Sequence, residues 1–553
     1  MRATGTEHKN NFLVQGSILA IASIISRIIG LIYRVPLTRI IGSVGNNYYA
    51  CAYEIYNIML IISSYSIPLA VSKVVAMHTA KKESKNAIRV FHASLIFAFT
   101  TGSIAALVIY FFGEYFATKL LATPLSIIAL EVLIPTLVIV AVLGVFRGFF
   151  QGLGTTVPSA FSQIIEQIIN AIVSVWAAYL LFDYGAKIGL ILGNKNKYAA
   201  AYGAAGGTLG TGVGSLSALI FIFFLYVVFR RTVLRKKIIH DHTRNDASYS
   251  SIFALLVMTI VPVLLSTTIY NISSIIDQGV FKNLALSLGS SSDDIDVWWG
   301  VFAGEYKVLI NVPISIASAM SASCVPSLTK AFHGGDYYES PRQIDASTHF
   351  IMLIAFPCAV GLFVLSSPIM QLLFNDSSDL ASNMLKVGAV SIVFYSLSTL
   401  SNGLLQGINR MRTPVTNAII ALFLHLIFLV ILIYTTKLYI FTVIIANAFY
   451  ALIMCILNSI ALRRYSGSET DWFHNFIMPF ISSLIMGFCA YGVYRIIYLT
   501  THIMIIAVAA SIAIAALVYF LALLFTRSVS RDELLGFPKG EYVVYLAEKM
   551  HLM

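Results

Sequence analysis

The sequence predicts an all-α polytopic membrane protein, and three observations carry this prediction. Of the 553 residues, 58% are hydrophobic and only 11% are charged, and the mean hydropathy is +0.84. Soluble domains contain about 25% charged residues, so this composition excludes a soluble fold. Apolar runs of about 20 residues or more, the length that crosses a bilayer, recur along the chain. Basic residues gather in every second connection between these runs.

Hydropathy and turn-forming residues predict about fourteen transmembrane helices, and the basic residues predict their orientation. Alternate connections, from the N-terminus to the C-terminal tail, hold 22 lysines and arginines, whereas the opposite set holds 6. The positive-inside rule therefore predicts a multi-pass protein of the cell membrane with both termini in the cytoplasm. The predicted spans are roughly 14–41, 48–77, 88–112, 124–150, 159–182, 203–229, 252–279, 300–329, 347–374, 380–408, 414–436, 439–462, 474–498 and 501–526.

Two pairs of similar segments indicate an internal duplication. Arg147-Gly-Phe-Phe-Gln-Gly152 is similar to Asn402-Gly-Leu-Leu-Gln-Gly407, and Ile67-Pro68 is similar to Val312-Pro313, with nearly equal offsets. Six helices return the chain to the same side, so we expect two six-helix lobes that are parallel repeats about an axis along the membrane normal. The predicted organisation is an N-terminal lobe over 1–240, a C-terminal lobe over 241–465, two extra helices over 466–526 and a cytoplasmic amphipathic tail over 527–553.

The first predicted span contains three arginines, Arg27, Arg34 and Arg39. An arginine at bilayer depth costs about 2.5–3.5 kcal/mol on insertion scales, so it is tolerated where it faces water or a partner. Arg27 and Arg34 are two helical turns apart and share one face. Two guanidinium groups on one face suit a phosphate-bearing ligand, because each can bind oxygens bidentately. Arg39 lies elsewhere on the helix near its far end, where snorkelling to an interface is the alternative.

Other ionisable side chains inside the predicted spans are functional candidates by default. We expect substrate contacts from Glu54, which could pair with an arginine, and from Lys73 and Lys307. Both lysines lie near span ends, where snorkelling is again the alternative. Four carboxylates in the spans could couple transport to protons or sodium ions. They are Glu131, Glu166, Asp277 and Glu305. For Glu131 and Glu166, which lie on neighbouring spans, structural pairing is the alternative.

A glycine-rich segment opens the sixth predicted span. Gly206, Gly210 and Gly214 recur every four residues and place small residues on one helix face. This spacing predicts close packing against another helix. A phosphate-binding loop is disfavoured, because neither GxxxxGK[ST] nor GxGxxG is present.

The sequence gives no support for an enzyme. No HExxH motif, cysteine–histidine cluster or nucleophile elbow is present, and the five cysteines lack metal-ligand spacing. Nothing in the chain forms a folded nucleic-acid reader. We therefore expect a transporter without a cofactor, driven by sodium ions, protons or the membrane potential.

Three segments resemble the polysaccharide-exporter branch of the MOP (MATE/oligosaccharidyl-lipid/polysaccharide) flippase superfamily, above all Gram-positive MurJ-type lipid II flippases and the stage V sporulation protein B group. They are Ser26-Arg-Ile-Ile-Gly-Leu-Ile-Tyr-Arg34, Ile67-Pro-Leu-Ala-Val-Ser-Lys-Val-Val-Ala76 and Arg147-Gly-Phe-Phe-Gln-Gly152. The resemblance implies two lobes around a V-shaped cavity, alternating access, and a groove for a polyprenyl tail along the last two helices. The family's arginines of the first helix match Arg27 and Arg34, and its basic residue of the eighth helix matches Lys307. Where better-known members carry an acidic residue early in the second helix, this chain reads Asn46-Asn-Tyr-Tyr.

The expected substrate is a lipid-linked, pyrophosphate-bearing peptidoglycan precursor such as lipid II. Membrane lipids and the cell-wall synthesis machinery are the other expected partners, and nucleic acid is not one. One alternative is a flippase for another lipid-linked oligosaccharide. Another is a MATE-type cation-coupled multidrug antiporter, which usually has about twelve spans and acidic drug sites. A membrane-embedded glycosyltransferase or acyltransferase would need a sizeable catalytic loop, and the sequence contains none.

Overall fold

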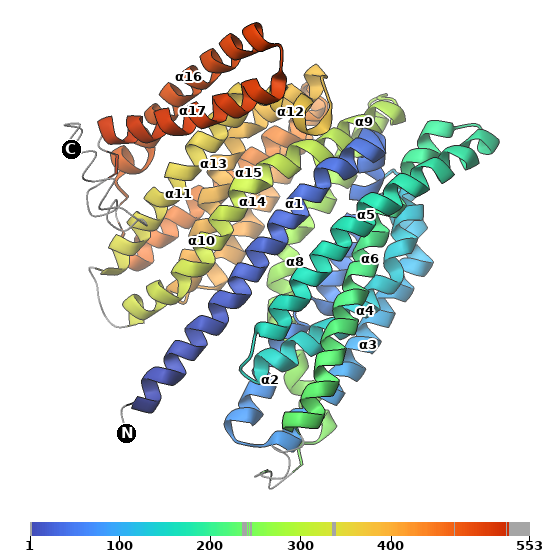
Figure 1. Cartoon of the computed structure of the whole chain (residues 1–553), viewed down its shortest axis with the longest axis vertical. Coiled ribbons are helices and arrows are strands. Elements are labelled where there is room, and N and C mark those ends of the chain that lie inside the picture. Colours follow the sequence, from blue (N-terminus) through green and yellow to red (C-terminus); the bar gives the residue numbers. More distant parts are fainter. Residues whose placement is uncertain are drawn as a thin grey trace. The chain divides into compact units, whose positions relative to one another are not determined.

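The computed structural model describes residues 3–234, 241, 243, 246–333, 339–468, 470–526 and 528–529. Every regular element in these ranges is a helix, which confirms the predicted all-α class (Figure 1). The chain forms two compact units, Met1–Gly304 and Glu305–Met553. Twelve helices among the described residues are long and apolar enough to cross a membrane.

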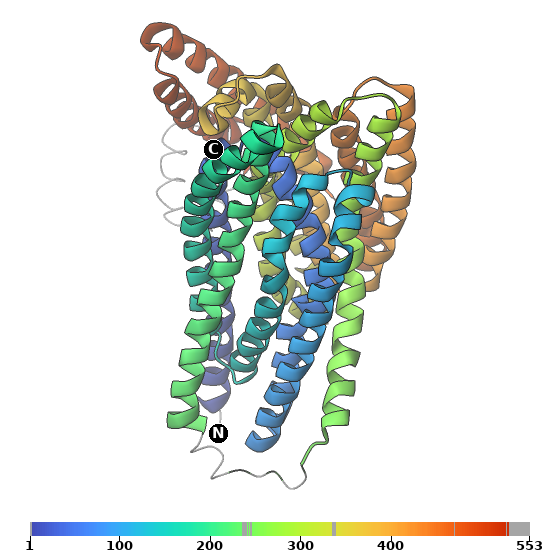
Figure 2. The same cartoon turned by 90° about the vertical axis from the view of Figure 1, so that its right-hand side faces the viewer.

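The first unit contains a bundle in which α5 and α6 run side by side next to α4 and α3 (Figure 1). Helix α8 runs along α3 (Figure 2) and also contacts α1 and α2. The elements are α1 (Ala3–Leu60), η1 (Ile61–Tyr65), α2 (Ile67–Ala80), α3 (Ser84–Tyr115), η2 (Phe116–Leu120), η3 (Pro124–Ser126), α4 (Ile127–Gly152), α5 (Val157–Leu192), α6 (Lys195–Phe229), η4 (Arg230–Leu234), α8 (Tyr249–Ser287), α9 (Ser292–Val301) and η5 (Phe302–Tyr306), which ends two residues beyond the unit.

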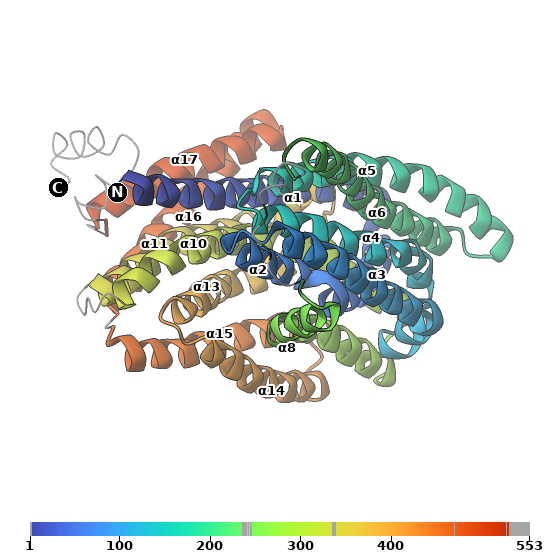
Figure 3. The same ribbon diagram turned by 90° about the horizontal axis from the view of Figure 1, so that it is seen from below.

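In the second unit α13 packs against α10, α11 and α15, while α14 pairs with α15 and α16 pairs with α17 (Figure 3). Its elements are α10 (Lys307–His333), α11 (Glu339–Val364), α12 (Ser366–Phe374), α13 (Asp379–Gly407), α14 (Arg412–Thr435), α15 (Phe441–Ser466), η6 (Phe473–Ile477), α16 (Met478–Thr501) and α17 (Met504–Phe525).

The first two predicted spans are not separated by a loop. Helix α1 continues from Ala3 to Leu60, and a single non-helical residue, Gly42 with φ of 69°, interrupts it. A positive φ is accessible to glycine at no steric cost, so the helix changes direction there without unfolding. The structure therefore corrects the expected connection over residues 42–47. It also divides the predicted span 347–374 into α11 and α12.

The glycine-rich segment packs as predicted. A β-carbon at Gly206 would lie 2.5 Å from the backbone of Ala177, and one at Gly214 would lie 2.6 Å from the Glu166 carbonyl oxygen. Since real β-carbons do not approach that closely, α5 and α6 meet at a distance that only glycine permits. Both helices of this pair pack against the arginine-bearing helix α1.

Glycines of the similar segments make close helix contacts in both halves of the proposed duplication. In the first unit, Gly148 of α4 lies against Pro68 of α2, where a β-carbon would be 2.6 Å from the proline carbonyl oxygen. In the second unit, Gly403 of α13 lies against Ser321 of α10 with comparably little space. The neighbour of Gly403 lies eight residues beyond Pro313, the counterpart of Pro68, so the two contacts differ in register and the repeat stays a prediction.

The predicted division at residue 240 differs from the boundary between the compact units, because α8 and α9 pack onto helices of the first unit. The lobes over 1–240 and 241–465 stay a prediction, as do the two extra helices as a tail groove and the cytoplasmic termini. Apart from residues 528 and 529, the predicted tail helix lies outside the described residues.

Candidate functional site

Arg27 and Arg34 lie on one uninterrupted stretch of α1, because the helix breaks only at Gly42. Their separation of two turns is therefore realised in the folded chain. Arg27 is exposed and Arg34 is half-buried. The Arg34 guanidinium carbon lies 4.2 Å from the centre of the Tyr49 ring. A contact at this distance is a cation–π interaction, which fixes the orientation of the guanidinium plane.

The surroundings of Arg34 hold this arrangement in place. Tyr49 is 1% exposed and stacks on Tyr53 with ring centres 5.7 Å apart. On the next face of α1, the Asn170 amide of α5 donates to the Tyr33 hydroxyl at 3.4 Å. Farther along, the Ser23 hydroxyl donates to the Gln163 side chain at 3.4 Å. The N-terminal part of α1 is therefore anchored to α5 by polar contacts.

The structure places the other predicted basic residues less centrally. Arg39 is exposed on α1, and Lys73 is exposed on α2. Lys307 is half-buried at the start of α10 in the second unit. Substrate contacts by these three residues stay a prediction.

Glu54 has a hydrogen-bond partner on α8. The Ser274 hydroxyl of α8 donates to the Glu54 carboxylate at 2.5 Å. Since Glu54 lies in α1 beyond Gly42, it belongs to the part of that helix that packs on α8. The carboxylate therefore joins α1 to α8, and its pairing with an arginine or contact with substrate stays a prediction.

A second polar group on α8 makes fully buried contacts with the rest of the first unit. Lys282 is 0% exposed, and its ammonium donates to the Asn47 side-chain oxygen at 2.5 Å and to the Thr123 hydroxyl at 2.6 Å. The Asn47 amide in turn donates to the Asp296 carboxylate of α9 at 2.8 Å. The Trp299 ring lies 5.8 Å from the ammonium. One asparagine therefore bridges a buried cation and a buried anion.

These contacts form one antiparallel stripe, which we name the α1–α8 seam. It consists of Asn47, Cys51 and Glu54 on α1, of Lys282, Gln278 and Ser274 on α8, and of Thr123 and Asp296 beside them. The spacing of three and four residues puts each set on a single helix face. Sequence reasoning missed the seam, because the predicted span ended at residue 279 and Lys282 was counted with a loop. The matching polar spacing on the two helices was the signal available.

The seam also contains an unsatisfied amide. Gln278 is 0% exposed, and neither its oxygen nor its nitrogen has a hydrogen-bond partner in the part of the chain that the structure describes. Beside it, Asp277 is 3% exposed. A buried amide without a partner costs free energy, so the helix pairing seen here contains a local strain.

The predicted coupling carboxylates are not equivalent. Glu166 is half-buried and receives the Arg147 guanidinium at 2.7 Å and the Ser215 hydroxyl at 2.7 Å. This ion pair matches the structural alternative for Glu166, with Arg147 as its partner. Glu131 is exposed on α4, and Glu305 is 3% exposed in the second unit. A role of these carboxylates in ion coupling stays a prediction.

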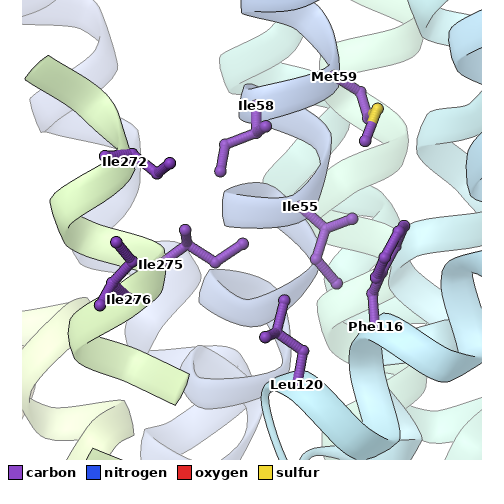
Figure 4. Close-up of a pocket in the computed structure, with 8 residues that line it drawn as sticks. All are labelled: Ile55, Ile58, Met59, Phe116, Leu120, Ile272, Ile275 and Ile276. Atoms are coloured by element: carbon purple, nitrogen blue, oxygen red, sulfur yellow. The ribbon is translucent and has the colours of Figure 1, made fainter. Parts of the chain in front are cut away.

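An apolar pocket of about 290 Å³ adjoins the seam in the first unit. Figure 4 shows Ile55 and Ile58 of α1 facing Ile272 and Ile275 of α8 across it, with Phe116 and Leu120 of η2 closing one side. The contact between α1 and α8 is therefore polar along the α1–α8 seam and becomes apolar about one turn after the Glu54–Ser274 hydrogen bond.

The described residues contain no group of three or more histidines, cysteines, aspartates or glutamates that could hold a metal ion. Among the same residues, the pattern that suits a ligand is the arginine face, Arg27 and Arg34. Oriented guanidinium groups can bind a phosphate or pyrophosphate through charge-assisted hydrogen bonds.

Comparisons with known proteins place the chain in a family. Residues 13–332 match the family described as polysaccharide biosynthesis protein, and residues 307–431 match the MatE family. The first match covers more than half of the chain. The chain is 24% identical over 428 residues to the lipid II flippase MurJ of Bacillus subtilis (strain 168), covering 75% of this chain and 76% of that protein. It is 23% identical over 540 residues to stage V sporulation protein B of the same organism, covering 96% and 98%.

Solved structures share the fold. A lipid II flippase MurJ in an inward closed conformation superposes with a TM-score of 0.64 at 17% identity, covering 92% of this chain and 98% of that one. An inward-facing multidrug-resistance MATE transporter of the MOP superfamily superposes with a TM-score of 0.57 at 15% identity, covering 80% and 100%. At these identities the likeness concerns the fold alone.

Proposed function

The chain belongs to the polysaccharide biosynthesis protein family, within the MOP flippase superfamily, and on that premise we propose that it flips a polyprenyl-pyrophosphate-linked peptidoglycan precursor, lipid II, across the cell membrane. The observation that carries the proposal is the arginine face. Arg27 and Arg34 lie two turns apart on an unbroken helix, and Tyr49 orients the second guanidinium.

The physical requirement of such a reaction explains why these residues matter. A headgroup with a pyrophosphate and sugars cannot cross hydrocarbon unaided, because its charges and hydroxyls would lose their hydration. Guanidinium groups replace that hydration during passage, while the polyprenyl chain stays in the bilayer. The ligand must bind both access states with similar affinity, since a strong preference would trap the carrier in one of them. No bond is made or broken, so the protein acts as a transporter.

A second candidate function has one observation in its favour. Residues 307–431 match the MatE family, whose solved members named above include multidrug-resistance transporters. A drug antiporter with an acidic site would have no use for two arginines on one face of the first helix. The lipid-linked substrate therefore accounts for more of this chain than a cationic drug does.

The decisive experiment removes the arginine face. We expect Arg27→Ala and Arg34→Ala each to weaken lipid II binding by roughly 10- to 150-fold, since a charge-assisted hydrogen bond contributes about 1.5–3 kcal/mol. Arg27→Lys should retain part of the binding, because lysine keeps the charge and loses the bidentate fork. Lipid II binding to the purified variants and growth of a flippase-depleted strain are the two measurements.

The matched control removes two other arginines. Arg230 and Arg231 are exposed at the end of α6 and beginning of η4, so the double variant Arg230→Ala/Arg231→Ala should bind and complement normally. Wild-type binding and growth by Arg27→Ala/Arg34→Ala, at normal membrane abundance, would refute the proposed site. Restored resistance to ethidium without restored growth would favour the drug antiporter.

A further inference from the structure

A second cavity lies wholly within the second unit. It has a volume of about 450 Å³ and is formed by α11, α13, α15 and the segment that leads into α16. This volume lies within the range of about 300–1,000 Å³ that is common for ligand pockets. Its walls are mainly apolar, with Phe356, Leu397 and Leu452 from three different helices. The cavity therefore fits a hydrocarbon chain.

One end of the cavity is polar. Ser468, Thr470 and Trp472 line it there, just after the last turn of α15. Trp472 is 68% exposed, as expected for a tryptophan at a membrane–water interface. The polar end belongs to the connection 463–473, which the positive-inside rule predicts to be cytoplasmic. The cavity thus runs from an interface toward the interior of the helix bundle.

Three exposed arginines gather at this end. Arg463 and Arg464 form the last turn of α15, directly after the cavity-lining Leu462. The Arg410 guanidinium lies 4.2 Å from the centre of the Tyr465 ring, and that of Arg464 lies 5.9 Å from it. Stacking uses the face of a guanidinium, whereas its N–H donors lie in the plane. The contact with Tyr465 therefore leaves donors available to an anion.

Two carboxylates near the same end already have partners. Asp471 accepts from the backbone N–H groups of Phe473 and His474 and from the His474 ring at 2.8 Å. Asp345 accepts from the Asn475 amide at 2.6 Å. The Asp345–Asn475 contact holds η6 against α11, and both acidic groups face backbone, ring or amide donors.

From this arrangement we propose that the cavity is a binding site for an anionic phospholipid, with one acyl chain between α11, α13 and α15 and the headgroup phosphate on Arg410, Arg463 and Arg464. An acyl chain gains little by leaving one apolar environment for another, so the headgroup decides which lipid binds. Clusters of basic residues on the cytoplasmic side of helix bundles favour anionic headgroups. The site is separate from the arginine face and does not depend on the proposed function.

Trp472 provides a direct reporter of occupancy. Purified full-length protein in neutral detergent is titrated with phosphatidylglycerol carrying dibrominated acyl chains, and in parallel with dibrominated phosphatidylcholine. The chain has four tryptophans, so the signal of Trp472 is the difference between the wild-type protein and Trp472→Phe. We expect phosphatidylglycerol to quench Trp472 at a lower mole fraction than phosphatidylcholine does.

Two sets of variants test the two parts of the site. The triple variant Arg410→Gln/Arg463→Gln/Arg464→Gln should lose the preference for phosphatidylglycerol, because each basic residue near an anionic lipid contributes about fivefold. The charge-matched control Lys81→Gln/Arg230→Gln/Arg231→Gln should keep it. Leu397→Phe/Leu452→Phe fills the cavity and should abolish quenching of Trp472 by either lipid. This variant tests the cavity independently, so the proposal can be tested if the triple arginine variant does not fold.

Three results would overturn the proposal. Equal quenching by the two phospholipids would show that the cavity does not select an anionic headgroup. Unchanged preference in the triple arginine variant would remove the headgroup site. Quenching by the filled-cavity variant at wild-type strength would show that Trp472 senses lipid outside the cavity.

Discussion

The two parts of α1 on either side of Gly42 use polar residues in opposite ways. Before Gly42, Arg27 and Arg34 are exposed and half-buried, and an aromatic ring is the contact that orients the second of them. After Gly42, Asn47 is fully buried and bridges a cation and an anion that come from α8 and α9. Before the break the helix therefore carries charged side chains that are not fully buried, whereas after it a polar side chain binds buried charges of neighbouring helices.

The difference shows how the cost of polarity in a membrane helix is offset. A buried charge is tolerated when hydrogen bonds and an opposite charge compensate it within the protein, as around Lys282. A charge that is exposed inside a span can be compensated by a ligand. The α1–α8 seam therefore serves helix pairing, and the arginine face is the part left for a substrate. Four predictions test this distinction, from the largest effect to the smallest.

Asn47→Leu should be the most destabilising change. It removes one hydrogen bond from the buried Lys282 ammonium and one from the buried Asp296 carboxylate, and each hydrogen bond to a charged group contributes about 1.5–3 kcal/mol. Lys282→Met should also destabilise the protein, because it leaves the buried Asp296 carboxylate without the nearby opposite charge and two neutral acceptors unpaired. The measurement is the free energy of unfolding in detergent.

The double variant Asn47→Leu/Lys282→Met separates this explanation from simple loss of packing. Since the two side chains contact each other, its cost should be smaller than the combined cost of the single variants. Strict additivity would show that the two side chains do not stabilise the fold through their mutual contact.

Gln278→Met should stabilise the protein. Methionine has a similar shape and removes a buried amide that has no partner among the described residues, a group that costs about 1–3 kcal/mol. We expect a higher midpoint of thermal unfolding. A lower midpoint would mean that the amide is satisfied in the folded protein.

Tyr49 should affect the arginine face through Arg34. Tyr49→Leu removes the ring and should weaken lipid II binding by about 0.5–2 kcal/mol, whereas Tyr49→Phe keeps the ring and should bind normally. In an Arg34→Ala background, Tyr49→Leu should add no further loss of binding. An equal loss in both backgrounds would show that Tyr49 acts by another route.

The smallest effect concerns the contact between His78, in the last turn of α2, and Glu83 in the connection that follows. The His78 ring donates to the Glu83 carboxylate at 2.7 Å and holds the pKa of Glu83 below its ordinary value of 4.5. A lowered carboxyl pKa stabilises the folded state above the ordinary value, and this contribution is lost as the pH falls through the lowered pKa. Glu83→Gln should therefore lower the unfolding midpoint slightly at pH 7 and leave it unchanged at low pH. A difference that grows with acidification would contradict this sign.

How much the sequence could predict is clear from particular residues. Composition and loop charges were sufficient for the all-α membrane class, because apolar length and charge bias are properties of the chain itself. The shared face of Arg27 and Arg34 followed from helical periodicity, since α1 is unbroken between them. The close packing at Gly206, Gly210 and Gly214 followed from their spacing in the same way.

Only the tertiary structure decided which polar residues are partners. Lys282 contacts Asn47 and Thr123, which are 235 and 159 residues away along the chain, and no local pattern specifies such pairs. The same holds for Glu54, which accepts a hydrogen bond from Ser274 of α8. Periodicity fixes the face on which a side chain lies, but the helix opposite that face is chosen by packing over the whole bundle. The packing of α8 against the part of α1 after Gly42 therefore makes the α1–α8 seam different from the arginine face.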